Sequence, residues 1–580
     1  MSTRFVKTPH AAVIVWNYND RLGREDTGTA STATDDVNQK IISTLSCTQI
    51  QTSKSKSQPN GTFSFVMAPY ANWIESITPG SWCAILMSNI PISKDDLTNA
   101  NRLQVKMVGK IESVRVDVNI DDAGAKHTTY NVSGTDWGHI FQSMLYIDNL
   151  LAGENDPRSQ GNAAAVAIRN ALFGSNGGSP KSFAVRENLA SIMNIFGQNL
   201  DGFDDAGRAI NRLAKAIYDF RMPQMMVDFF KFKDPKGNIS RDRRVNKVLK
   251  LQTGRLVAND KYNEDPEASG FIDPFSLQGT NTFWQILLEN SNPAMNEMFC
   301  EMKWDKDQTV TGSPNLVLYN RIKPFSFKES DFNKPRSLTS MFQNLRTHKI
   351  ETGGDIDPVE VISINAGTNW RDKFNFIEIK PQFQDFVVIA NWVKQKSQIA
   401  DPGAFQREGF RPLIVGTKQF PFDGKKDPLD VHVDMAQLSL WAQTLREWYF
   451  DTHRMLNGTI VLHGVDEYIA VGENIRFPAG LINTTPNMNA STVKKGANEF
   501  VLAHVESVAH SFGQVDGART YTTTIQFVRG IIVDGDNVIS GRGTLDQFAA
   551  SVGVGDSRNR TNVISTSDEN DPDKLKHQGT

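Results

Sequence analysis

Two histidines near the end of the chain come closest to the spacing of a metal site. His504 and His510 are six residues apart, and an even spacing puts both side chains on one face of an undistorted strand. Imidazole is a common metal ligand, but a metal site needs further donors, and no cluster of Asp, Glu or Cys accompanies this pair. We therefore interpret both as polar residues of the surface or of a subunit interface, and we expect no metal ligands.

Three carboxylates in the middle of the chain resemble an acid/base group. Asp201, Asp204 and Asp205 lie within five residues, and paired carboxylates carry the chemistry of glycoside hydrolysis. The same residues stand just before or inside the first turn of an expected helix, where negative charge interacts favourably with the helix dipole. We interpret them as the start of a helix.

The remaining chemical patterns are incomplete. The segments GRG at 541–543 and SVGVG at 551–555 have neither a strand-to-helix context nor a GK(S/T) sequence, so they do not fit nucleotide-binding loops. DGDN at 534–537 lacks the downstream Glu of a calcium loop. The basic segment RDRR at 241–244, continued by Lys247 and Lys250, suits phosphates but has no interleaved aromatic residues. With no nucleophile elbow and no HExxH, we expect no catalytic, cofactor-binding or metal residues, and no enzyme.

Length and composition favour a large globular protein. The 580 residues allow roughly three or four domains. The formal net charge of −3 does not suggest a nucleic-acid or membrane binder. The sequence contains no run of about 18 apolar residues, so we expect neither a membrane-spanning helix nor a signal peptide. Cys47, Cys83 and Cys300 are expected to be buried thiols in a protein made in a reducing cytoplasm.

The elements that must position these residues are mostly strands. Alternating apolar and polar residues between 11 and 135 predict one small antiparallel sheet, curled into a barrel. Helical spacing at 163–173 and 201–220 predicts helices that follow it. Further along, 283–289 is expected to be a short helix and 315–319 a strand, and a helix is expected at 435–450.

One strand-rich unit is written twice. IESV at 111–114 is followed by GAKHTTY at 124–130, and VESV at 505–508 is followed by GARTYTT at 517–523. Upstream of each stands a Gly-led strand, GSWCAIL at 80–86 and GENIRF at 472–477. A unit used twice in one chain favours a pseudo-symmetric object, such as a ring to which each subunit supplies two equivalent segments.

Several further segments resemble the hub proteins of contractile phage baseplates. They are NGTFSF at 60–65, ITPGSW at 77–82, VGKIESV at 108–114, NPAMNEMF at 292–299, LVLYNRIKPF at 316–325, GENIRF at 472–477 and TTTIQFVRG at 522–530. The family includes the T-even-like hub, the late control protein of temperate phages and the base of type VI secretion spikes. Each motif is short, but their order along the chain is that of the family, and the likeness as a whole extends over about half of the chain.

The resemblance implies an α+β fold with two similar antiparallel β-barrel tube domains. The residue pattern itself indicates a mainly helical insertion and a mixed α/β domain between them and an extended C-terminal arm after them; the insertion and the arm are departures from the family. The expected boundaries are 1–139 for the first tube domain, 140–275 for the helical insertion, 276–355 for the mixed α/β domain, 356–383 with 454–532 for the second tube domain, 384–453 for an excursion ending in a helix, and 533–580 for the arm.

The resemblance also implies a function and partners. Hub proteins of this family are homotrimers, and three copies with two tube domains each form a pseudo-sixfold ring that joins the tail tube protein to the central spike protein. Other baseplate or wedge proteins surround the ring, and genomic DNA passes through its channel without specific binding. The expected location is the tail baseplate of a virion, after synthesis in the host bacterial cytoplasm, with no cofactor.

Two other functions remain open from the sequence. A tail-associated peptidoglycan hydrolase would degrade cell wall through a single essential carboxylate, and a glycan-binding receptor protein would bind polysaccharide in an exposed aromatic groove. The arm, rich in Gly, Ser, Asp and Asn, has too little apolar surface for a core of its own, and we expect it to order only on a neighbouring subunit or partner.

Overall fold

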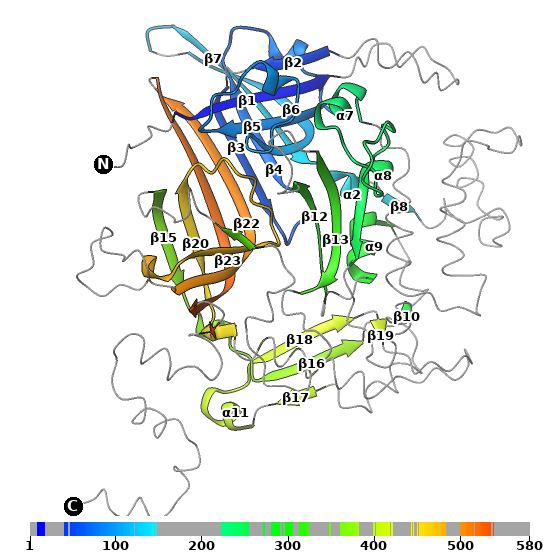
Figure 1. Ribbon diagram of the computed structural model, residues 1–580, viewed down its shortest axis with the longest axis vertical. Helices are drawn as coiled ribbons and strands as arrows, with labels where there is room; N and C mark the ends of the chain where they lie inside the picture. Colours follow the sequence, from blue (N-terminus) through cyan, green and yellow to red (C-terminus); the bar gives the residue numbers. More distant parts are fainter. Residues whose placement is uncertain are drawn as a thin grey trace, which may run out of the picture.

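The computed structural model of the chain consists mostly of strands (Figure 1). The residues it describes are 8–17, 40–44, 47–120, 122–143, 145–147, 222–253, 271–272, 280–290, 293, 296–304, 313–323, 347–349, 360–381, 398–400, 402–417, 419–420, 442, 445, 449, 452–482, 499–515, 517–534 and 537–538. Among these residues no helix combines the length and apolar character needed to cross a membrane.

Fourteen strands form one large sheet, whose main path runs β15-β20-β23-β22-β3-β4-β7-β6-β5-β1-β2. Their bounds are β1 His10–Asn17, β2 Lys40–Thr44, β3 Cys47–Ser55, β4 Thr62–Met67, β5 Trp82–Ser88, β6 Val105–Ile120, β7 Lys126–Asp136, β15 Val361–Gly367, β20 Leu456–His463, β22 Glu499–Val515 and β23 Ala518–Asp534. Off this path, β14 (Thr347–Lys349) pairs with β21 (Asn474–Pro478), β21 with β22, and β24 (Asn537–Val538) with β23.

The alternation seen in the sequence sets which face of each strand is buried. In β4, Phe63 and Phe65 are buried while Thr62 and Ser64 are exposed, because successive side chains of a strand point to opposite sides. The expected turn after β6 is present, and Gly124 adopts a φ of 78° there, a value that glycine tolerates without cost.

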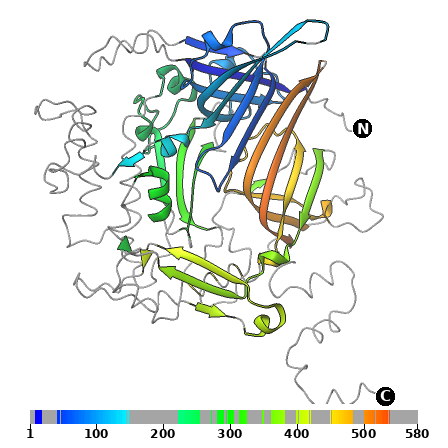
Figure 2. The same cartoon turned by 180° about the vertical axis from the view of Figure 1, so that it is seen from behind.

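The sheet contains the same arrangement of strands twice. The first repeat has the order β3-β4-β7-β6-β5, and the second repeat has the order β15-β20-β23-β22-β21. Each repeat has its own apolar core, around residues such as Phe65 and Ile85 in the first and Ile460 and Phe477 in the second. In both views β3 and β22 lie side by side where the repeats meet (Figures 1 and 2).

The doubled motifs occupy equivalent points in the two repeats. The β6–β7 register shifts between Ile111 and Ser113, and the β22–β23 register shifts between Val505 and Ser507, so each strand has a β-bulge at the motif glutamate. The Gly80 amide donates to the Ile111 carbonyl at 2.7 Å, and the Gly472 amide donates to the Val505 carbonyl at 2.9 Å. The sequence repeat is therefore a structural repeat.

The two expected closed barrels are not present in the described residues. The first repeat does bring β1 and β3 into one core, but these two strands do not pair. The physical reason is that the second edge of β3 is already occupied by β22, over Gln49–Ser55 and Ser507–Gly513. An antiparallel strand has only two edges, so this pairing joins the repeats into one sheet instead of closing the first.

Smaller elements pack beside the large sheet. A three-stranded sheet has the order β12-β13-β9, with β12 Asn296–Trp304, β13 Pro314–Ile322 and β9 Leu249–Thr253. The α-helices are α1 Trp73–Ser76, α2 His139–Ser143, α7 Gln224–Phe230, α8 Val245–Val248, α9 Phe283–Asn290 and α11 Pro402–Glu408. The 3₁₀ turns are η1 Asp95–Leu97, η7 Trp370–Asp372, η8 Thr452–Arg454 and η9 Ala479–Leu481. Two-stranded pairs join β8 (Leu145–Ile147) to β11 (Thr280–Thr282) and β10 (Phe271–Ile272) to β19 (Gln419–Phe420).

Some predictions from the sequence are corrected by these elements. β16 (Phe376–Pro381), expected in the second tube domain, instead forms a separate sheet with β17 (Gln398–Ala400) and β18 (Pro412–Thr417). Its neighbours lie in the excursion, which sequence alternation cannot reveal. The strand β23 continues to Asp534 and pairs with β24, so the first residues of the expected arm belong to the sheet.

Other predictions are confirmed or fall elsewhere. The helix at 283–289 and the strand at 315–319 are present as α9 and β13, and all three cysteines are buried and free. The α+β class is only partly confirmed, because strands dominate the described residues and their longest helix, α9, has 8 residues. The helices expected at 163–173 and 201–220 and the arm beyond 538 lie outside the described residues, as does most of the helix at 435–450.

Candidate functional site

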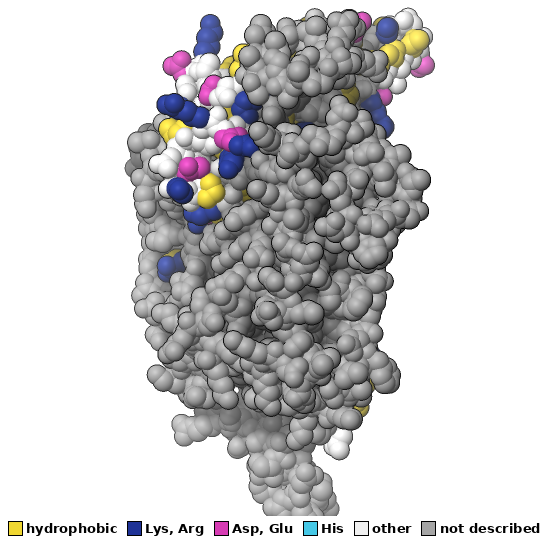
Figure 3. All heavy atoms as spheres, turned by 90° about the vertical axis from the view of Figure 1, so that its right-hand side faces the viewer, with side chains coloured by type: hydrophobic (Ala, Val, Ile, Leu, Met, Phe, Trp, Pro, Cys, Tyr) yellow, Lys and Arg dark blue, Asp and Glu magenta, His cyan; other side chains and the backbone are white. Residues whose placement is uncertain are grey.

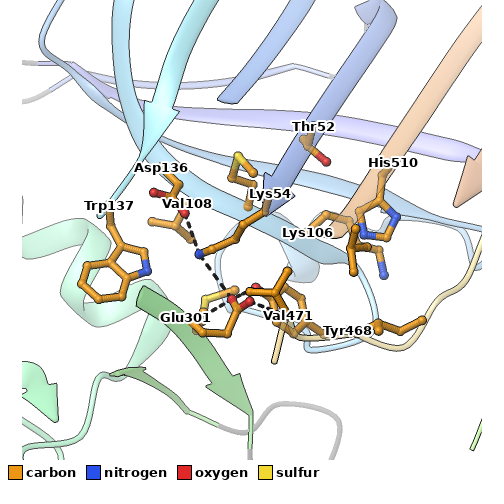
Figure 4. Close-up of a pocket in the computed structure, with 14 residues that line it drawn as sticks. Thr52, Lys54, Lys106, Val108, Asp136, Trp137, Glu301, Tyr468, Val471 and His510 are labelled. Carbon is orange, nitrogen blue, oxygen red and sulfur yellow. Dashed lines mark hydrogen bonds and ion pairs between the residues drawn. The ribbon is translucent and has the colours of Figure 1, made fainter. Parts of the chain in front are cut away.

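A buried ion cluster lies where the two repeats and the β12-β13-β9 sheet meet (Figure 4). The ammonium of Lys54 is 2.6 Å from a carboxylate oxygen of Asp136 and 3.4 Å from one of Glu301. Side chains of all three are at most 9% exposed. Two carboxylates and one ammonium thus share a site from which water is almost excluded.

Three strands position the side chains of Lys54, Asp136 and Glu301. Lys54 and Ile50 have the same parity in β3, so an alternation that buries Ile50 also buries Lys54. Asp136 is the last residue of β7, and Glu301 is in the middle of β12. The cluster therefore ties one strand end of the first repeat to a separate sheet.

The carboxylate of Glu301 also holds a segment of the second repeat. It accepts hydrogen bonds from the Tyr468 hydroxyl, from the Val471 amide at 2.9 Å and from the Met302 amide at 2.7 Å. Burial raises the pKa of Glu301, while Lys54 and these donors oppose the rise. Burial would lower the pKa of Lys54, but Asp136 and Glu301 outweigh it and hold that pKa above its usual value.

A second buried lysine stands beside this cluster with a different balance. Lys106 donates to the main-chain carbonyls of Asp466 at 2.6 Å and Leu103 at 3.1 Å. Burial lowers the pKa of Lys106 to about 7, and the charges of Asp466 and Glu467 only partly oppose this shift. A neutral carbonyl offsets the cost of burying an ammonium less than a carboxylate does. The pKa of Lys106 therefore lies near neutrality.

Further polar contacts fasten the loop of Asp466 to the first repeat. One carboxylate oxygen of Asp466 accepts hydrogen bonds from the Ser88 hydroxyl at 3.0 Å and from the main-chain amide of Asn89 at 2.6 Å. At the strand junction, the Lys56 ammonium is 2.9 Å from Glu297 and 3.3 Å from Glu506, the bulged residue of β22.

The interpretation of the two histidines as surface residues is wrong. His504 and His510 are 0% and 5% exposed, and their Nδ1 atoms lie 3.1 Å from Asn474 Oδ1 and 3.0 Å from Thr523 Oγ1. Burial lowers the pKa of His510 well below its usual value, and Lys106 adds to this effect. Both histidines are hydrogen-bonded parts of the interior. Within the described residues no group of three or more His, Cys, Asp or Glu side chains is arranged to hold a metal ion.

The space inside the cluster is too small for a substrate. About 20 Å³ among Lys54, Lys106, Asp136, Glu301 and His510 is accessible to the centre of a water molecule, which is room on the order of one water. General acid/base chemistry would need a reactant within hydrogen-bond reach of these groups. The arrangement orients and locks chain segments, and nothing larger than water fits among its charges.

Sequence reasoning singled out other residues and missed this cluster. In the basic segment, Arg244 forms an ion pair with Asp242, with 2.9 Å between Nε and Oδ1. Asp201, Asp204, Asp205 and the glycine segments beyond 540 lie outside the described residues, as do positions 535–536 of DGDN. The signal for Lys54 was its place on the apolar side of an alternating strand, since a lysine is almost never fully buried unless it is paired. Its partners carry no comparable signal.

Comparisons with known proteins give remote likenesses in structure alone. No known family description matches this sequence, and no curated protein sequence matches it. Solved structures similar to this chain include a tail protein from Neisseria meningitidis MC58, with 12% identity, a TM-score of 0.40, and coverage of 90% of this chain and 96% of that one. The 43 kDa tail protein of prophage MuSo2 from Shewanella oneidensis has 12% identity and a TM-score of 0.36, over 89% of this chain and 98% of that one.

A chain of the Francisella PdpA-VgrG complex in its half-lidded form has 7% identity and a TM-score of 0.32, over 90% of this chain and 58% of that one. Phage tail proteins and the base of type VI spikes are the classes that the sequence motifs resemble. TM-scores below 0.5 do not support transferring a function from these proteins to this chain.

Proposed function

We propose that this chain is the structural hub of a contractile-tail baseplate, in which three copies form a pseudo-sixfold ring between the tail tube and the central spike. The observation that carries this proposal is the direction of the two repeats. Every pairing from β22 through β3, β4 and β7 to β6 is antiparallel, so β22 and β6 run in the same direction. Equivalent strands that run the same way fit a rotation about a common axis, as a ring requires.

An uncharged region at the centre of one face of the large sheet supports a channel, while β6 adds Arg115 and Asp117 to the same face. The outward side chains of its central strands are exposed or half-buried and none carries a formal charge; they are Gln49, Gln51, Ser53, Thr62, Ser64, Ser133, Ser507, Ala509, Ser511, Thr522, Thr524 and Gln526. A hollow lies over this face between β3, β4, β22 and β23. Figure 3 shows another side of the molecule, the right-hand side of Figure 1, where Lys and Arg mix with Asp and Glu near the top.

This composition suits passage without binding. Proteins that hold DNA neutralise its phosphates with Lys and Arg, and Ser, Thr and Gln offer no such charges. We propose that this face lines the channel, that genomic DNA passes it without specific binding, and that the tail tube, the spike and other baseplate or wedge proteins contact the two ends and the rim. The proposed location is the tail baseplate of a virion, after synthesis in the host cytoplasm.

The division into domains follows the repeats. We propose that the strands of the first repeat form the first tube domain and those of the second repeat form the second, and that each closes as a barrel only with its neighbours in the ring. The β12-β13-β9 sheet then braces both tube domains through Glu301.

The decisive experiment is a reconstruction of the intact tail. Three copies of the chain per particle at the tube–spike junction are expected, each contributing two adjacent tube domains. Six copies per particle would refute the proposal. Mass photometry of the purified chain is a weaker test, because a hub ring can require the spike to nucleate it.

A muralytic assay on purified protein separates the hub from a hydrolase. We expect no cleavage of peptidoglycan, because Glu301, whose pKa burial raises, is held in a cluster with room for about one water. Cell-wall cleavage that a single carboxylate substitution abolishes would overturn the structural, non-enzymatic assignment.

A further inference from the structure

The junction between the repeats is a strand pairing that leaves the second hairpin buried. The outer half of β22, Ser507–Gly513, pairs antiparallel with Gln49–Ser55 of β3. Two side chains of this hairpin, Phe512 and Tyr521, are each 3% exposed and belong to the core of the first repeat. The second repeat thus completes the first through its hairpin.

The equivalent hairpin of the first repeat has no such partner in the part of the chain that the structure describes. β5 pairs with β6 only between Val105 and Lys110, and β6 then continues to Ile120 with β7 on one side. Among the described strands, β15, the equivalent of β3, likewise ends the sheet path and pairs only with β20. Within the described residues both halves of a second junction are therefore present and unpaired.

We infer that the β6 edge of one copy pairs antiparallel with β15 of a second copy, repeating between subunits the β22–β3 junction that exists within the chain. This inference rests on the proposed ring and specifies how its subunits meet. Because each chain then has one internal junction and offers one external junction, three copies close a ring of six repeats.

The internal junction fixes the register. Ser113 and Ser507 both follow the bulge, so Asp117 is the equivalent of Ser511. Pairing through β4 and β20 makes Asn365 of β15 the equivalent of Gln51. Since Ser511 is opposite Gln51, Asp117 of one copy is expected opposite Asn365 of its neighbour.

The same equivalence between positions of the two repeats predicts the other residue pairs. Phe512 is opposite Ile50 within the chain, so Val118 is expected opposite Ile364 of the next copy. His510 is opposite Thr52, which makes Val116 the partner of Ala366. Val116 and Val118 of β6, which match the buried His510 and Phe512 of β22, thus each meet an apolar residue of β15.

Exposure of apolar side chains marks these two edges. Val116, Val118 and Ile120 are 38%, 46% and 71% exposed, and Ile362 of β15 is 46% exposed. Ile364 and Ala366 are partly buried and already pack against the core of the second repeat. An apolar strand edge left open promotes pairing with another chain, and here each edge has a partner of matching pattern.

The position of the hairpin agrees with this role. In both ribbon views the β6–β7 hairpin projects beyond the body of the molecule, while β15 lies at the margin of the sheet (Figures 1 and 2). Side chains 115–120 of β6 are all exposed, so the hairpin reaches a neighbour without unfolding any packed element.

Disulfide trapping tests the register. The double variant Asp117→Cys with Asn365→Cys places two thiols on directly opposite residues of neighbouring copies, at about 4.5–5.5 Å between Cα atoms, within disulfide range. The matched control, Arg115→Cys with Ser363→Cys, uses the same strands but separates the thiols by four residues, about 13 Å. The native thiols of Cys47, Cys83 and Cys300 are buried and free.

The expected result, after mild oxidation of the full-length chain both purified and in assembled particles, is a ladder of covalent dimers and trimers for the first variant. The control is expected to stay below one tenth of that yield. Equal cross-linking of both variants, or cross-linking of the control alone, would overturn the register.

A second variant separates this inference from the hub itself. Val118→Asp leaves the isolated fold intact because Val118 is exposed in the single chain, but it places a charge in the expected interface, where we expect at least a tenfold loss of trimer by native mass spectrometry. Trimers that persist in this variant, without cross-links in the Asp117–Asn365 pair, would refute the strand pairing and leave the hub. Monomers alone in both purified protein and particles would refute the ring and the pairing together.

Discussion

The two repeats share their strand order, their bulges and their glycine turns, yet their outer hairpins lie in different environments. The hairpin of the second repeat lies on β3 and places Phe512 in the core of the first. The hairpin of the first repeat extends away from the body, and the equivalent residue, Val118, is 46% exposed. One structural unit therefore has a buried and an open version, and the proposed strand pairing would bury the open one against a second copy.

The repeats also differ at the base of their first strands. Lys54, next to Ser53 in β3, is paired with two buried carboxylates, while Thr368, the equivalent position after Gly367 of β15, is exposed. Buried charge thus reinforces only the junction that already exists within the chain.

The largest expected effect comes from removing the cation of that junction. Lys54→Met leaves Asp136 and Glu301 buried without a counter-charge, which costs about 3–5 kcal/mol. The measurement is the change in unfolding midpoint of the full chain in urea. Thr368→Met is the matched control and is expected to change stability by less than about 0.5 kcal/mol. A similar loss for both variants would show that the two strand ends are not as different as their burial indicates.

Truncation of the buried hairpin residue has the next largest effect. Phe512→Ala removes an aromatic ring from the first core and is expected to cost about 3 kcal/mol. Val118→Ala, at the equivalent exposed position, is expected to cost less than about 0.5 kcal/mol in the isolated chain. Thermal unfolding of both variants measures the difference, and an equal destabilisation would contradict the open state of the first hairpin.

Stability is also expected to depend on pH through Lys106, a buried lysine of the first repeat. The pKa of Lys106 is lowered by burial to about 7, so between pH 7 and 10 the unfolded chain binds more protons at this residue than the folded chain. The stability of the folded chain then rises with pH over this interval. The penalty for burying Lys106 is complete at pH 7 and below, and it fades as pH approaches 10.

Lys106→Met is expected to remove this slope. The measurement is the midpoint of thermal unfolding at several pH values from 6.5 to 10, for wild type, for the variant and for the exposed-lysine control Lys126→Met. The groups facing Lys106 are Asp466, Glu467 and His510, and all three remain in the variant. A slope that is unchanged in Lys106→Met would show that the lysine stays protonated in the folded chain.

The smallest effect tests where the repeats are alike. Gly124 and Gly517 have φ values of 78° and 81°, and a Cβ added at either would meet no atom within 4 Å. Replacing either by Ala is therefore penalised through the backbone alone, by about 1 kcal/mol. Chemical denaturation should give the same loss for both variants within about 0.3 kcal/mol, and a clear difference would indicate that the two turns are not equivalent.

The repeat itself was predictable from the sequence, because its signals are local. Glycine at positive φ and the alternation of IESV and VESV depend on a few neighbouring residues, so the same turns and bulges form in both places. The strands β1, β4, β6 and β13 were predicted for the same reason.

Which distant strands pair with each other was not predictable from such local signals. Barrels were expected from the alternation in the sequence and from the resemblance to hub proteins, but β22 pairs with the second edge of β3. β16 was assigned to the second repeat by proximity in sequence, yet its partners β17 and β18 lie in the following excursion. A strand edge pairs with the strand that the fold brings next to it. The alternation of apolar and polar residues does not indicate which strand that is.

The sequence by itself determined the doubled unit, its turns and the inward face of each strand, since these follow from backbone sterics and a two-residue period. Only the tertiary structure decided that Lys54, Asp136 and Glu301 form one cluster and that both histidines are buried. A single charged residue in a strand looks the same whether its partner is water or a carboxylate on another sheet. Coulomb attraction acts through space, so the three-dimensional path of the chain, and not spacing along it, fixes which charges meet.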